Sequence, residues 1–211
     1  MQVLTEYQKL EYNSKIIKEQ KERGDPITLS GLFQQADTPN GNNRVYPYGI
    51  LKRETEKYQD LIQNKRSVST LDHEDSPVIA LEKVSHIITE LTFDDGTGAV
   101  KGRLQVLNTP MGKIVQELLV GGVSLGISSR GVGSLVREGN YEKVDEDFML
   151  IAFDIVSVPS VGNAQLVREA KNRFFTNVNI QYPSSREVSK LFSKEDRLSA
   201  VLSQILQKDS K

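Results

Sequence analysis

The stretch Gly121–Gly133 has the sequence Gly-Gly-Val-Ser-Leu-Gly-Ile-Ser-Ser-Arg-Gly-Val-Gly. Apolar and small residues alternate from Val123 to Ser128, a period of two that predicts a strand with one apolar face and one small, polar face. Five glycines in thirteen residues weaken a strand, so their presence requires an explanation. The close approach of another backbone, a bulge or a bound substrate would each explain them. Two interpretations remain open: a Gly/Ser-rich strand at a tight barrel corner, and a face that carries a serine nucleophile.

The length and composition of the chain limit the classes of protein to which it can belong. The full chain has 211 residues, 37% of them hydrophobic, which is enough for one domain with a substantial core. A net charge of -1 gives no general attraction to nucleic acid or membrane, so we expect neither as a partner. The absence of cysteine excludes disulfides, thiolate nucleophiles and cysteine-ligated zinc. No apolar run approaches a membrane span, and a soluble protein of a reducing compartment is the expectation.

The order of apolar and turn residues predicts a mixed α+β chain. Thr109-Pro110 has the features of a helix start, and Gly121 those of a helix end. The run 148–158 is the most apolar in the chain and predicts a buried strand. The other expected elements are a weak helix over 4–23, strands over 27–33, 78–93 and 99–107 with a hairpin turn at 94–98, a surface helix over 49–64, and one or two amphipathic helices over 185–207.

Three side chains could carry chemistry together with the serine. Asp154 stands inside the most apolar run, where an ionised carboxylate needs a partner; it could cap or pair with a buried arginine, or orient an imidazole. His73 lies among small polar and acidic residues, as an exposed loop histidine or as a general base. His86 lies on an expected strand, and we interpret it as structural. No spacing of these residues is typical of a metal site, although the acids around His73 could hold a hard cation.

A serine, a histidine and a buried acid are the minimum set for acyl transfer, because a serine hydroxyl needs a base and the base needs an orienting group. The order along the chain would be His73, Ser128, Asp154, without the Gly-x-Ser-x-Gly elbow of lipase-type enzymes. Strand alternation places Ser128 on the small face and turns Ser129 the other way, which favours Ser128 as the nucleophile and leaves Ser129 as the second candidate.

Several segments together resemble the prohead core proteases of T-even-like tailed phages, which are related to the herpesvirus assemblin proteases. The segment 126–134, Gly-Ile-Ser-Ser-Arg-Gly-Val-Gly-Ser, is nearly identical to the family's nucleophile segment. Asp154 precedes a short apolar stretch and Pro-Ser, as in the family. The other matching segments are 31–36 (Gly-Leu-Phe-Gln-Gln-Ala), 40–47 (Asn-Gly-Asn-Asn-Arg-Val-Tyr-Pro) and, with Asp for Asn and Glu for Pro, 70–74 (Thr-Leu-Asp-His-Glu).

The resemblance implies a closed, mostly antiparallel β-barrel flanked by helices, in an α+β chain. Together with the apolar stripes of the two ends, it gives an expected N-terminal helical arm over 1–24, a barrel protease domain over 25–183 and a C-terminal amphipathic helix over 184–211. The implied catalytic residues are Ser128, His73 and Asp154, and the implied oxyanion support comes from Ser129, Arg130 and Gly131.

The same resemblance implies an activity and its setting. The expected function is a serine endopeptidase, without metal or other cofactor, that degrades the scaffolding core and trims capsid precursor proteins inside the phage prohead in the host cytoplasm. It would cleave after glutamate and act as a homo-oligomer. The alternative is a catalytically inactive scaffold or capsid-assembly module with the same barrel.

Overall fold

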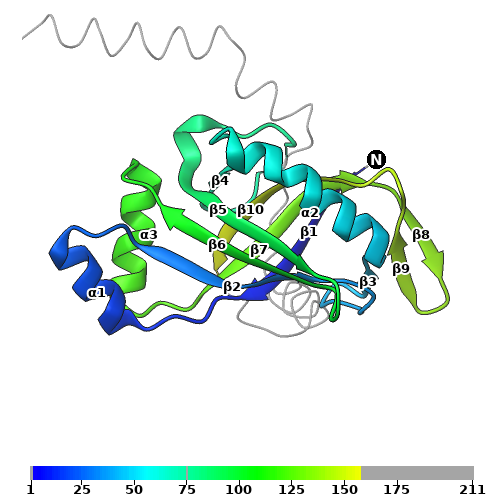
Figure 1. Ribbon diagram of the computed structural model, residues 1–211, viewed down its shortest axis with the longest axis horizontal. Helices are drawn as coiled ribbons and strands as arrows, with labels where there is room; N and C mark the ends of the chain where they lie inside the picture. Colours follow the sequence, from blue (N-terminus) through cyan, green and yellow to red (C-terminus); the bar gives the residue numbers. More distant parts are fainter. Residues whose placement is uncertain (1, 75, 158–211) are drawn as a thin grey trace, which may run out of the picture. The chain divides into compact units, whose positions relative to one another are not determined.

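The computed structural model describes residues 2–74 and 76–157, all within one compact unit, Met1–Asn163. They form an α+β fold in which helices flank mostly antiparallel sheets (Figure 1). The helices are α1 (Ser14–Arg23), α2 (Tyr48–Gln63), α3 (Pro110–Val120) and the short 3-10 helix η1 (Leu81–Lys83). The strands are β1 (Gln2–Lys9), β2 (Thr28–Gln35), β3 (Arg44–Val45), β4 (Val68–Thr70), β5 (Val84–Asp94), β6 (Ala99–Val106), β7 (Leu125–Gly133), β8 (Leu135–Glu138), β9 (Tyr141–Val144) and β10 (Met149–Ser157). Within these residues, no helix is long and apolar enough to cross a membrane.

The strands form three sheets in the part of the chain that the structure describes. The first has the order β1-β7-β10, the second β2-β6-β5-β4 and the third β3-β9-β8. All their ladders are antiparallel except the short β3–β9 pair. Strand β7, which contains most of the Gly121–Gly133 stretch, is therefore hydrogen-bonded on both sides.

The closed barrel that the resemblance implied is not present among the described residues. The first two sheets meet at one seam through a single parallel bridge between Leu71 and Ile155, and at the other seam β1 and β2 are in contact without a ladder. Strand β4 ends at Thr70, and Asp72 takes a left-handed backbone conformation with φ of 63°. That conformation turns the chain out of the strand, so pairing with β10 cannot continue.

The N-terminal segment differs from the expected helical arm. Residues 2–9 form strand β1, and the helix begins only at Ser14, where the side chain of Asn13 accepts from the Lys15 amide. Leu4 and Glu6 are both buried on the sheet. The sequence pattern concealed this strand because one of its buried positions is a glutamate, whose burial depends on partners far along the chain.

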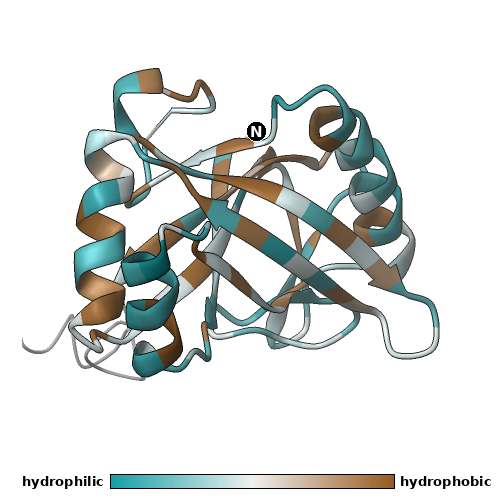
Figure 2. Cartoon of the chain, turned by 60° about the vertical axis from the view of Figure 1, so that its left-hand side comes forward, coloured by the Kyte–Doolittle hydropathy of each residue, from teal (hydrophilic) through white to brown (hydrophobic). Residues whose placement is uncertain are grey.

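Elsewhere the expected elements are confirmed, except that the strand expected over 78–93 begins only at Val84, after the 3-10 helix Leu81–Lys83. The Thr109 hydroxyl accepts from the Gly112 amide at 3.0 Å, Pro110 begins α3, and the helix ends before Gly121. Apolar and polar residues alternate along the strands and form stripes on the helices (Figure 2). Phe153 of β10 is fully buried in the core, and its ring centre lies 5.1 Å from that of Phe33. The expected helix over 184–211 and the end of the 25–183 domain lie outside the described residues.

Candidate active site

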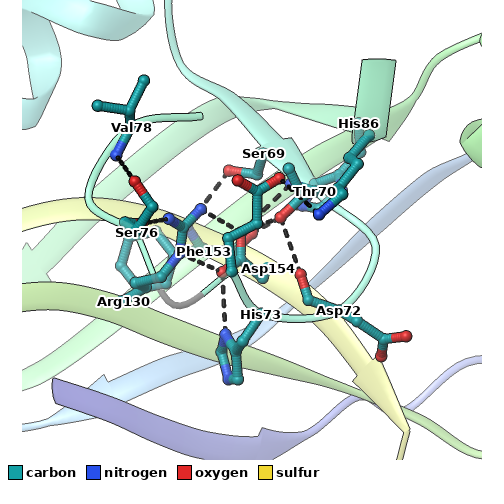
Figure 3. Close-up of polar contacts among 12 residues, drawn as sticks. Ser69, Thr70, Asp72, His73, Ser76, Val78, His86, Arg130, Phe153 and Asp154 are labelled. Atoms are coloured by element: carbon teal, nitrogen blue, oxygen red, sulfur yellow. Dashed lines mark hydrogen bonds and ion pairs between the residues drawn. The ribbon is translucent and has the colours of Figure 1, made fainter. Parts of the chain in front are cut away.

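The carboxylate of Asp154 is the centre of a buried hydrogen-bond network (Figure 3). Its Oδ2 lies 2.9 Å from His73 Nδ1 and accepts from Arg130 Nε at 2.7 Å. Its Oδ1 accepts from Arg130 Nη2 at 3.2 Å and from the Thr70 amide at 3.2 Å. The Thr70 hydroxyl, 3.0 Å from Oδ1, shares its one proton between Oδ1 and the Asp72 carbonyl, which is 2.8 Å away. Five donors thus surround one carboxylate, which is the satisfaction that a buried charge in an apolar strand requires.

These contacts determine the charge of Asp154 and the tautomer of His73. Burial by itself would raise the pKa of Asp154, but hydrogen bonds from His73 and Arg130 and the Arg130 charge outweigh it and lower the pKa below its ordinary value. An ionised carboxylate can only accept hydrogen bonds. In the neutral form of the His73 ring the proton therefore lies on Nδ1, and Nε2 then has a lone pair that can take a proton from another group.

The register of β7 and β10 places Ser128 beside this network. Ser128 lies directly opposite Asp154 in the antiparallel ladder, so both side chains project from the same face of the sheet. Ser129 lies opposite Phe153 and projects from the other face, toward the core. Ser128 and Ser129 are 2% and 1% exposed, so their burial does not distinguish them, whereas their direction does.

His73 reaches Asp154 because the loop after β4 is attached to β10. The Asp72 amide donates to the Ile155 carbonyl at 2.8 Å, one residue beyond Asp154. Asp72 adopts a left-handed conformation that aspartate and asparagine tolerate better than most residues, so aspartate is compatible with the position where the family has asparagine. The His73 side chain is 29% exposed, which leaves one edge of the ring accessible while Asp154 is fully buried.

The Arg130 side chain has other partners than a substrate oxyanion. It is completely buried; Nε and Nη2 donate to Asp154, and Nη1 donates to the Ser76 carbonyl at 2.6 Å. The guanidinium therefore connects β7, β10 and the loop that carries His73. Thr70 and Ser76 also belong to this network, and no feature of the sequence singled them out, because a threonine in a strand and a loop carbonyl carry no local signal.

The Asn/Arg/Tyr-Pro segment binds a glutamate on β1. Glu6 is 2% exposed, and its carboxylate accepts from Asn42 Nδ2 at 2.8 Å, Arg44 Nη1 at 3.1 Å and the Tyr46 hydroxyl at 2.9 Å. Because Glu6 lies opposite Ser129 of β7, this network attaches the loop to the strand that borders the candidate nucleophile. The segment thus has a structural role next to the site.

His86 has the surroundings of a structural residue, as expected. It is completely buried, with Nε2 2.7 Å from the Phe153 carbonyl and Nδ1 2.8 Å from the Ser85 hydroxyl. A carbonyl can only accept, so Nε2 carries the proton and Nδ1 accepts from the hydroxyl. Burial lowers the pKa of His86 to about 4, although the Phe153 carbonyl and Asp154 act in the opposite direction.

This low pKa predicts a loss of stability in mild acid. Between pH 6.5 and 4 the unfolded chain binds a proton at His86 that the folded chain does not, so the free energy of unfolding should fall as the pH falls. We expect a loss of roughly 2 kcal/mol between pH 7 and pH 5, measured by urea unfolding. His86→Gln, which keeps an N–H donor without a titratable ring, should remove most of this slope. An unchanged slope in the variant would contradict the assignment.

Of the acids near His73, Asp72 and Glu74 belong to the described residues and Asp75 lies outside them. Residues 2–74 and 76–157 contain no group of three or more histidine and acidic side chains that could hold a metal ion. The Glu74 carboxylate instead lies 3.7 Å from Lys83 Nζ.

A carboxylate hydrogen-bonded to a histidine, with a serine directly across the ladder from that carboxylate, is a combination of groups that serine hydrolases use. Comparison with known proteins agrees with this class: residues 12–172 match the family described as prohead core protein serine protease, and the chain belongs to that family. A curated relative, the prohead core protein protease of Enterobacteria phage T4, is 31% identical over 145 residues, which cover 65% of this chain and 66% of that protein, just under two thirds of its length.

A solved structure gives the same result at the level of the fold. The bacteriophage T4 capsid assembly protease, gp21, matches with a TM-score of 0.64 and 24% sequence identity, over 75% of this chain and 98% of that one. At this identity the match concerns the fold alone.

Proposed function

We propose that this chain is a serine endopeptidase that degrades scaffolding core proteins and trims capsid precursors inside the prohead. The observation that supports it most is the position of Ser128, which lies directly across the ladder from an Asp154 carboxylate that already holds His73 at 2.9 Å. The family membership supplies the class of reaction. The printed names of the relatives, which refer to the prohead core and capsid assembly, suggest the substrates and the location.

In the proposed mechanism Ser128 Oγ attacks the carbonyl carbon of the scissile peptide bond, and His73 Nε2 takes its proton. When the tetrahedral intermediate collapses, the carbon–nitrogen bond breaks and His73 gives the proton to the leaving amine. Water then hydrolyses the acyl-enzyme by the same route, which frees Ser128. Asp154 stays ionised throughout and stabilises the imidazolium, while Arg130 and Thr70 hold Asp154 in place.

The oxyanion donor is proposed among the backbone N–H groups of Ser129–Gly131. The pairing of β10 with β7 shifts register between Leu150 and Ala152, opposite Gly131 and Arg130. Such a bulge interrupts the regular ladder, and bulges are frequent beside active sites. We assign the Arg130 side chain to the positioning of Asp154, since three of its nitrogens already donate to protein acceptors.

Covalent labelling tests the proposal directly. A fluorophosphonate, from which an activated serine displaces fluoride, should modify Ser128, as located by mass spectrometry of the digested protein. Labelling should persist in a chelator, because no step uses a metal, and in Ser129→Ala. Failure of the folded protein to react would favour the catalytically inactive assembly module. Loss of labelling on chelation would point to a metal-dependent reaction instead.

A further inference from the structure

Strand β1 contributes a tyrosine to the face that carries the candidate nucleophile. Tyr7 lies directly opposite Ser128 in the β1–β7 ladder, just as Asp154 lies opposite Ser128 in the β7–β10 ladder. Opposite residues of antiparallel strands project from the same face. Tyr7, Ser128 and Asp154 therefore form a row across three strands, with the serine between the phenol and the carboxylate.

The Tyr7 ring lies against β7 where Gly126 has no side chain. A Cβ atom added at Gly126 would come within 1.9 Å of Tyr7 Cε2 and 2.8 Å of both Cδ2 and Cζ. Any larger residue would displace the ring, so this position must be glycine for the ring to lie there. Gly126 is two residues before Ser128 and therefore lies on the same face of the strand. The glycine in the opening stretch thus makes room for a side chain beside the nucleophile.

The Tyr7 hydroxyl is buried, and it has no hydrogen-bond partner within residues 2–74 and 76–157. Burial raises the pKa of Tyr7, so the phenol remains a protonated donor. A buried hydroxyl without a hydrogen-bond partner is unfavourable, because it has given up its hydrogen bonds to water and gained none in the protein. By contrast, the Tyr46 hydroxyl on the neighbouring loop donates to Glu6 at 2.9 Å.

We propose that Tyr7 is a substrate-binding residue of the candidate protease site, whose hydroxyl donates a hydrogen bond to an acceptor oxygen of the polypeptide bound at Ser128. The inference rests on the proposed function. It also gives a purpose to the Glu6 network, because Asn42, Arg44 and Tyr46 hold the residue adjacent to Tyr7 and so fix the strand from which the phenol projects.

Tyr7→Phe tests the proposal, because it removes the hydroxyl and keeps the ring over Gly126. With a quenched fluorescent peptide containing glutamate before the cleaved bond, kcat/KM should fall about tenfold, the effect of one hydrogen bond worth about 1.4 kcal/mol. The rate of fluorophosphonate labelling at Ser128 should stay unchanged, since this small reagent does not need the peptide contact. A merely structural defect would lower both rates together, and that result would overturn the proposal.

Matched variants distinguish the contribution of the Tyr7 ring to kcat/KM from that of its hydroxyl. Gly126→Ala should displace the ring and lower kcat/KM at least as much as Tyr7→Phe, whereas Gly31→Ala, on a strand with open space around it, should not. Tyr141→Phe removes a hydroxyl that binds Glu138 on the β8–β9 hairpin and should leave kcat/KM unchanged.

The failure of this inference is distinguishable from that of the proposed function. If Ser128 is labelled in the wild type but Tyr7→Phe cleaves the peptide within twofold of the wild-type rate, the role of Tyr7 is refuted and the protease remains. If the wild type is neither labelled nor active, the proposed function fails first. A peptide with alanine in place of glutamate identifies the acceptor. If Tyr7→Phe still lowers kcat/KM for this peptide, the acceptor is a main-chain oxygen. If the substitution no longer lowers kcat/KM, the acceptor is the glutamate carboxylate.

Discussion

Ser128→Ala should lower peptide hydrolysis by several orders of magnitude, as removal of a triad serine does elsewhere. The reason is that Ser128 alone of the two adjacent serines shares a sheet face with Asp154 and its hydrogen-bonded His73. Ser129→Ala is the matched control, because it removes the same atom from the opposite face. Its kcat/KM should fall less than about tenfold, an effect expected of a small change in packing.

Steady-state cleavage of the quenched peptide measures both variants, and urea unfolding checks that each is folded. Two outcomes would contradict the assignment. Equal, small losses would mean that neither serine attacks the substrate, and a larger loss for Ser129→Ala would make the second candidate the nucleophile.

The second large effect concerns the base and its orienting acid. His73→Ala should cost more activity than Asp154→Asn, because it removes the proton acceptor itself and not only the group that orients it. We expect a loss of several orders of magnitude for His73→Ala and on the order of ten- to a thousandfold for Asp154→Asn. The asparagine can donate to the ring and so select the wrong tautomer, with the proton on Nε2.

Asp154→Asn has a second consequence that the structure predicts. Arg130 is fully buried against Asp154, so loss of the carboxylate charge leaves a buried guanidinium uncompensated. Breaking a buried pair in this way costs about 3–5 kcal/mol. Activity of this variant must therefore be compared at a temperature where urea unfolding shows it folded. A larger loss of activity for Asp154→Asn than for His73→Ala would contradict the assignment of His73 as the base. So would an active His73→Ala enzyme that His86→Ala inactivates.

Much of the site follows from local sequence pattern. The period-two alternation around Ser128 and Ser129 separates the two hydroxyls onto opposite faces, because successive side chains of any strand point in opposite directions. Asp154 in the most apolar run indicated a buried carboxylate with partners. Helix α3 was predicted with its first residue and its end, because Thr109, Pro110 and Gly121 act through backbone geometry within one turn.

Only the tertiary structure decided which groups satisfy Asp154. His73 and Thr70 come from 81 and 84 residues away, and no local pattern encodes a pairing at that separation. The same is true of β1, whose buried Glu6 is stabilised by residues 36 to 40 positions further along the chain.

The expectation of a closed barrel was wrong for a related reason. Whether two sheet edges join depends on where each strand ends, and at one edge that was decided by the left-handed turn at Asp72, which strand propensity does not indicate. Sequence by itself therefore determined most of the elements, though not β1, together with the face of the serine and the family resemblance. The long-range pairings determined the hydrogen bonds that could make the serine reactive, since each depends on ladders formed between segments that are distant in sequence.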